Sequence, residues 1–240
     1  MRKTSRPVLR AVLAQRWLDL CFLHWAVDPK RVAPWLPPGV RPDVIDGATY
    51  VGLIAFRMVG LGFGIGPGLP WIGTFLETNV RLYTVDDYGR RAVVFRSLEA
   101  SRLLAVLTAQ ISLRLPYKWA QMQFRREGEE VTYLCRRRWP GSRGATSRMR
   151  IRIGEPLLEP SPLDHFLTAR WGLHTQIGRR TVHLPNEHPT WPLYEAKLCH
   201  LDDNLVSAAG FPDLTDPPRS VLYSPGVPVN FGGPSLLPTV

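Results

Sequence analysis

Three side chains suited to acid–base and anion chemistry recur at every second position of one segment. Glu77, Asn79 and Arg81 alternate with small or apolar residues, so a β-strand would place all three on one face. If that face lines a cavity, burial and mutual charge shift the pKa values of the carboxyl and guanidinium groups. The strand that returns along this one adds Arg96 and Glu99 near its end. A solvent-exposed face is the alternative, because antiparallel sheets often have one.

Lys118 is the second candidate for chemistry. It is one of only four lysines and lies between Tyr117 and Trp119. A lysine in apolar surroundings binds its proton less tightly and can act as a Schiff-base nucleophile. In the alternative interpretation, its carbon chain lies along Trp119 and its charge reaches water.

A basic surface is the third candidate. Arg148, Arg150 and Arg152 alternate with apolar residues, which predicts a strand with a basic outer face. Together with residues 136–138 this face would line a groove for an anion. A surface for nucleic acid usually also offers stacking aromatic side chains, and only two lie nearby. We therefore do not expect a nucleic-acid partner.

Several other chemistries lack their sequence patterns. The six histidines form no HxH or HExxH motif, so no metal is expected, and no cofactor is expected either. The glycine-rich stretch Gly60–Gly66 is not followed by the Lys-Ser or Lys-Thr of a phosphate-binding loop. No Gly-x-Ser-x-Gly motif is present, and adjacent residues such as Cys199 and His200 would point to opposite faces of a strand.

The composition sets the class of protein. The 240 residues carry a formal charge of +10 and are 45% hydrophobic, which favours a folded globular chain over a disordered one. No apolar run is long enough for a membrane helix or a signal peptide. Three widely spaced cysteines are typical of free thiols in a reducing compartment, so we expect a cytoplasmic protein. The oligomeric state is not encoded in any pattern that we recognise.

The sequence predicts many short strands and few helices. We expect one domain over residues 1–240, mostly antiparallel β-structure, with an ordered, meandering Pro-rich tail from about residue 211 to 240. Gly60–Gly68 is predicted as a loop. The predicted helices cover residues 10–25, 28–37, 101–113 and 161–170. The predicted strands cover residues 49–58, 74–83, 91–98, 131–139 and 148–153, with a hairpin within 172–182.

Six short blocks carry a resemblance to a known family. They are His24–Pro29, Leu36–Gly39, Pro70–Tyr83, Ser97–Ala100, Leu115–Tyr117 and His188–Leu193. In content and order they resemble the DUF2071 (YqjF-like) family, which is grouped with the acetoacetate decarboxylase-like superfamily. The resemblance implies a curved antiparallel β-barrel with a central cavity and a few peripheral helices. It also implies that the polar face of the strand at 74–83 points inward.

The resemblance does not bring the decarboxylase mechanism with it. Those enzymes have a Pro-Lys-Lys-x-Ala pattern in which the first lysine forms the Schiff base. The nearest match here reads Pro116-Tyr117-Lys118-Trp119-Ala120 and has tyrosine at the nucleophile's position. A tyrosine cannot form an imine, whereas Glu77 is similar to a pocket glutamate of the family.

The leading hypothesis is therefore a cavity that binds or transforms a small carboxylate or oxo-acid. Glu77 would be the acid–base group and Tyr117 a hydrogen-bond donor. Arg81, with Asn79, Arg96 and Glu99 as further ligand-binding residues, would hold the negative charge. The alternatives are a decarboxylase- or aldolase-type lyase that uses Lys118, and an anion-binding arginine surface.

Overall fold

The computed structural model of the chain describes residues 8, 10–64, 66–103, 114–141 and 144–237. In this part of the chain, thirteen strands form one continuous sheet. The strands are β1 (Leu13–Val27), β2 (Val40–Pro42), β3 (Thr49–Phe63), β4 (Phe75–Asp86), β5 (Arg91–Ala100), β6 (Tyr117–Glu127), β7 (Glu130–Trp139), β8 (Thr146–Pro156), β9 (Gly172–Ile177), β10 (Arg180–Glu187), β11 (Tyr194–Asp203), β12 (Ser220–Phe231) and β13 (Ser235–Leu236).

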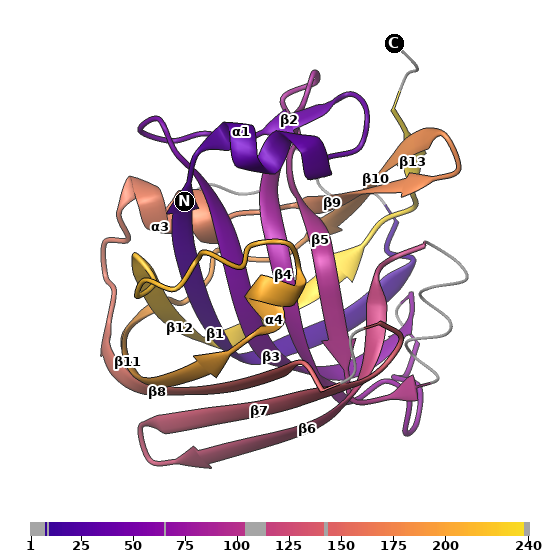
Figure 1. Cartoon of the computed structure of the whole chain (residues 1–240). Coiled ribbons are helices and arrows are strands. Elements are labelled where there is room, and N and C mark those ends of the chain that lie inside the picture. Colours follow the sequence, from indigo (N-terminus) through magenta and orange to yellow (C-terminus); the bar gives the residue numbers. More distant parts are fainter. Residues whose placement is uncertain (1–7, 9, 65, 104–113, 142–143, 238–240) are drawn as a thin grey trace.

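Nine of these strands close into a barrel (Figure 1). Around the ring the order is β5, β6, β7, β8, β11, β12, β1, β3 and β4, and the β4–β5 pairing closes it. The expected β-barrel is thus present. It is mixed rather than purely antiparallel, because β5 runs parallel to both β6 and β9.

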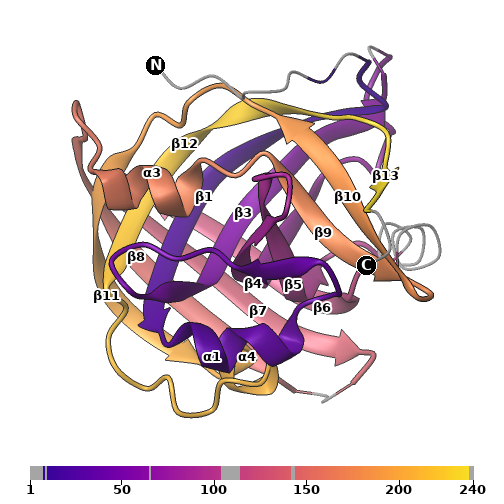
Figure 2. The same ribbon diagram turned by 90° about the horizontal axis from the view of Figure 1, so that it is seen from above.

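A second enclosure shares one wall with this barrel. The β9–β10 hairpin bridges from β5 to β12, so β12, β1, β3, β4 and β5 have packed protein on both sides. One core lies within the nine-strand ring and includes Val80, Leu82 and Met149. The other lies between the shared wall and the β9–β10 side, and includes Phe22 and Tyr83. In the view from above, β9, β10 and helix α3 (Pro162–Thr168) lie away from helices α1 (Pro29–Val32) and α4 (Leu205–Ala208) (Figure 2).

The short helices follow their predicted starts. Asp28 caps α1 by accepting a hydrogen bond from the Lys30 amide, and a 3₁₀ turn, η1 (Ala33–Trp35), continues it. Ser161 caps α3 in a reciprocal capping box with Asp164. Most of the predicted helix at 101–113 lies outside the described residues.

The prediction for the segment at residues 10–25 is wrong. The segment predicted as a helix over residues 10–25 is strand β1, because both of its faces are buried and its apolar residues run on without strand-like alternation. The segment predicted as a Pro-rich tail contains β12, a barrel strand that pairs with β1. The predicted glycine-rich loop begins later than expected, since β3 continues to Phe63.

The predicted hairpins are present. β4 and β5 pair around the turn at residues 86–90, β7 pairs with β8, and β9 pairs with β10. On β8, the exposed Arg148, Arg150 and Arg152 alternate with the buried Met149 and Ile151, as their spacing predicts. Within the described ranges, no helix has both the length and the apolar character needed to cross a membrane.

Candidate functional site

Strand β4 brings Glu77, Asn79 and Arg81 to one buried face. The side chains of its other face, such as Val80 and Leu82, point into the nine-strand ring. The Glu77 face therefore points away from the ring and into the second enclosure, towards β9, β10 and α3. The resemblance implied that this face points into the central cavity of one barrel. In the structure the face is buried, but it lies outside the nine-strand ring. Burial of both faces follows because β4 lies in the shared wall.

Glu77 is the acidic centre of this face. Its side chain is only 2% exposed. The Tyr117 hydroxyl donates a hydrogen bond of 2.8 Å to Oε2, and the Asn79 amide donates one of 3.1 Å to Oε1. Burial raises the pKa of Glu77 from 4.5 to about 7, although both hydrogen bonds and Arg81 act to lower it. Near neutral pH this carboxyl can therefore give or take a proton.

Arg81 supplies a cation next to this acid. Its guanidinium donates a hydrogen bond to the Tyr83 hydroxyl and lies 5.7 Å from the Phe22 ring centroid. Among the described residues, no carboxylate forms a salt bridge with it, and its Nε has no hydrogen-bond partner. Arg81 and Tyr117 keep some accessible surface, although burial shifts the pKa of both. A small anion would therefore meet an arginine that no carboxylate of the described residues contacts in a salt bridge.

Two residues that the sequence analysis did not select complete the cluster. The His24 Nε2 atom lies 2.6 Å from the Tyr83 hydroxyl oxygen in a hydrogen bond. Burial, and then the charges of Arg81 and Arg170, lower the pKa of His24 and so favour its neutral form. Tyr83 shares the alternating face of Glu77 and is recognisable from spacing. His24 comes from β1, and only the β1–β3–β4 pairing shows its proximity.

Glu99 and Lys118, both predicted site residues, lie on the opposite side of the wall. Glu99 pairs in register with Thr78 and Lys118, whereas Tyr117 pairs with Leu98. The fully buried Glu99 accepts two hydrogen bonds from Arg137, at 2.5 and 3.0 Å, and one from Ser97 at 3.2 Å. These residues form a separate ion pair in the nine-strand ring.

Two other arginines occupy places that the sequence did not indicate. Arg137 was grouped with its surface neighbours but is only 3% exposed, because β7 turns this position towards Glu99. Arg96, predicted to bind ligand beside Arg81, follows a register shift in the β4–β5 ladder. Its guanidinium lies 3.8 Å from the Trp35 ring centroid, and its Nε donates to the Ala209 carbonyl oxygen at 3.1 Å.

The structure thus brings together four of the seven predicted residues: Glu77, Asn79, Arg81 and Tyr117. The other three, Arg96, Glu99 and Lys118, lie elsewhere. Among the residues that can be described, no three His, Cys, Asp or Glu side chains gather as a metal-binding group.

Comparisons with known proteins agree with this architecture. The family model for DUF2071, an uncharacterized conserved protein, matches residues 14–228. The uncharacterized protein YqjF of Bacillus subtilis is 28% identical over 186 residues, which cover 78% of this chain and 76% of YqjF.

Two solved structures show the same fold at low sequence identity. Acetoacetate decarboxylase from Legionella pneumophila is similar with a TM-score of 0.68 and 13% identity, covering 98% of this chain and 94% of that one. The enduracididine biosynthesis enzyme MppR complexed with pyruvate gives a TM-score of 0.63 and 13% identity, covering 98% and 93%. The chain therefore belongs to the DUF2071 family and has an acetoacetate decarboxylase-like fold.

Proposed function

We propose that the cluster around Glu77 and Arg81 binds a small carboxylate, with 2-oxo acids such as pyruvate as the leading class. The observation that carries the proposal is that Arg81 forms no salt bridge with a carboxylate of the described residues, although Glu77 lies close enough to influence its charge. Other buried arginines of the described chain are matched, Arg137 by Glu99 and Arg170 by Asp43. A buried cation without a counter-ion is costly, and an anionic ligand would compensate it.

The neighbouring groups suit the rest of such a ligand. Glu77 is the proton donor or acceptor, and Tyr117 orients it through its hydroxyl. The free Oδ1 of Asn79 can accept a hydrogen bond from a ligand hydroxyl or enol. That MppR, which shares the fold, is complexed with pyruvate supports this choice of ligand class.

Calorimetric titration with pyruvate and with its uncharged analogue pyruvamide tests the proposal. Pyruvate should bind and pyruvamide should not. Arg81→Gln should weaken pyruvate binding by about 10- to 100-fold, since a charge-assisted hydrogen bond contributes roughly 1.5–3 kcal/mol. Arg81→Lys should retain part of the affinity. Arg150→Gln, on the outer face of β8, is the matched control and should leave binding unchanged. Equal binding of the two compounds would contradict the proposal.

Lys118 supports a second candidate function, imine formation in a lyase-type reaction. Burial and then Arg137 lower the pKa of Lys118, which increases the fraction of neutral amine. Its position across the wall from Glu77 separates it from the acid of the first proposal. Borohydride trapping with acetoacetate or pyruvate distinguishes the two, because only the second function leaves an adduct on Lys118.

We also propose that residues 1–240 form one domain and act in the cytoplasm. The three cysteines are free, and Cys21 and Cys135 are buried, which suits a reducing compartment.

A further inference from the structure

Strand β5 has a gap in its pairing along one edge. On its other edge, β4 pairs with it over most of its length. On the gapped edge, β9 pairs only at Val93, opposite Leu173, and β6 begins to pair only at Leu98, opposite Tyr117. Among the described residues, none pairs with residues 94–97 on that edge. We call this interruption of the wall the β5 window.

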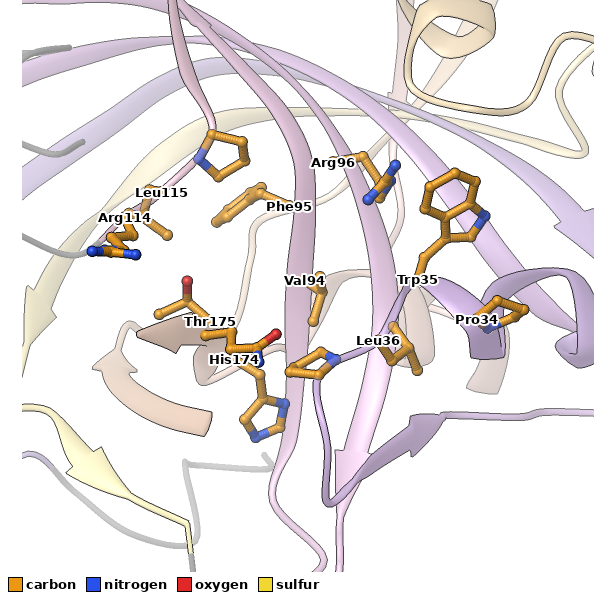
Figure 3. Close-up of a pocket in the computed structure, with 13 residues that line it drawn as sticks. Pro34, Trp35, Leu36, Val94, Phe95, Arg96, Arg114, Leu115, His174 and Thr175 are labelled. Carbon is orange, nitrogen blue, oxygen red and sulfur yellow. The ribbon is translucent and has the colours of Figure 1, made fainter. Parts of the chain in front are cut away.

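A pocket of about 380 Å³ occupies the β5 window (Figure 3). Its lining comes from β5, from β9, from the segment that leads into β6, and from the turn around η1. In Figure 3, Arg114 and Arg96 lie at opposite sides of the pocket, and Phe95 lies between them. The lining residues are Pro34, Trp35, Leu36, Pro37, Val94, Phe95, Arg96, Arg114, Leu115, Pro116, His174, Thr175 and Gln176.

The floor of this pocket adjoins the proposed site. Phe95 is the cross-strand partner of Arg81, so the two side chains share a face of the sheet. Phe95, Leu115 and Tyr117 also pack in the same hydrophobic core, the one that contains Tyr83. Phe95 thus belongs both to the pocket lining and to the face of the sheet that carries Arg81.

The mouth of the pocket is positively charged. Arg96 is held against Trp35 and by the Ala209 carbonyl, and within the described residues no carboxylate forms a salt bridge with Arg96 or Arg114. Two cations without a carboxylate in salt-bridge contact raise the local concentration of anions at the pocket. The same charge preference therefore occurs at the mouth and at Arg81.

We propose that the β5 window is the entrance to the interior site, and that Arg96 and Arg114 capture the negative charge of an incoming acid there. The proposal rests on the proposed function for its destination. Its test uses two reagents whose reaction rates depend on their access to the interior site, whether or not pyruvate is the natural ligand.

The test places a thiol at the destination. Asn79→Cys is made in a Cys199→Ser background, and its alkylation is followed by mass spectrometry of the peptide that contains residue 79. Iodoacetate is an anion and iodoacetamide is a neutral reagent of similar size. In both reactions the thiolate sulfur bonds to the methylene carbon, iodide leaves, and the thiol proton goes to solvent.

Arg96→Gln and Arg114→Gln should each slow iodoacetate by about 3- to 10-fold at low ionic strength, and the effect should shrink with salt. Neither should change the rate with iodoacetamide, and Arg96→Lys should restore the iodoacetate rate. Gln176→Trp at the pocket rim should slow both reagents. Gln123→Trp, on the outer face of β6, is its control and should slow neither. Circular dichroism and the melting temperature confirm that each variant is folded.

Two results would overturn the proposal: equal slowing of both reagents by the arginine variants, or unchanged rates with Gln176→Trp. Failure of the proposed function looks different. In that case pyruvate does not bind in calorimetry, but the alkylation rates still depend on Arg96 and Gln176. A site that binds pyruvate and is reached by another route gives the reverse combination.

Discussion

The raised pKa of Glu77 makes a quantitative prediction about stability. An ordinary glutamate has a pKa of 4.5, and burial raises that of Glu77 to about 7 in the folded protein. The folded state therefore holds this proton more tightly than the unfolded state. Its contribution to stability is fully present below pH 4.5 and is lost as the pH rises through 7. At about 1.4 kcal/mol for each pKa unit, the loss is about 3 kcal/mol.

Glu77→Gln removes this loss, because glutamine stays neutral at every pH. The free energy of unfolding is measured by urea denaturation of both proteins at intervals from pH 4 to pH 8.5. Titrating groups that do not interact with Glu77 are common to the two proteins and cancel in the difference. Relative to the wild type, the variant should gain about 3 kcal/mol between the ends of this range, most of it between pH 4.5 and 7.

An exposed glutamate serves as the control. The hydrogen bond from Arg152 lowers the pKa of Glu130, so Glu130→Gln should show the opposite pH trend, and a small one. A difference between wild type and Glu77→Gln that stays constant with pH would refute the reasoning. It would mean that Glu77 ionises as readily in the folded protein as in the unfolded chain, and that the site is hydrated.

Four further predictions follow from the same contacts. Tyr117→Phe removes a hydrogen bond that favours the ionised form of Glu77, so the carboxyl pKa measured by carbon-13 NMR should rise. Pyruvate affinity, measured by calorimetry, should fall as the pH rises through 7, because ionised Glu77 repels the anion, and Glu77→Gln should flatten this dependence. Arg137→Met leaves Glu99 buried without its partner and should cost about 3–5 kcal/mol in urea denaturation, and adding Glu99→Gln should recover part of it. If the Glu77 site carries the function, borohydride trapping with pyruvate should leave no adduct on Lys118. The wild type and Lys118→Ala should then give the same result.

The alternation on β4 could be interpreted without the structure because only one register of a strand gathers Glu77, Asn79 and Arg81. The residues that other strands place beside this face could not be identified in the same way. Glu99 lies two positions from Ser97 on β5, the strand that returns along β4. The β4 residue that lies opposite Glu99 determines the face of the sheet on which Glu99 lies. A shift of one residue in the pairing would place Glu99 on the other face. The irregularity near Arg96 changes that register in the middle of the strand, and no sequence pattern marked it.

The strand β1 was missed for a different reason. Sequence patterns indicate a strand when one face is wet, because polar and apolar residues then alternate. Around Leu20 and Leu23, both faces of β1 meet apolar protein, so the apolar residues are continuous and a helix fits them equally well. The burial that hides this strand from sequence analysis comes from the two enclosures that share the wall.

The pairing of β1 with β12 has a consequence for the synthesis of the protein. Leu13 lies opposite Phe231 and His24 lies opposite Ser220. One edge of β1 therefore stays unpaired until β12 has been synthesised. A ribosome releases β12 long after β1, and contacts so distant in sequence form slowly. Until then, an apolar strand edge is open to pairing with other chains. We expect nascent or truncated chains that lack residues 220–231 to aggregate or to bind chaperones, whereas the finished chain closes its own edge.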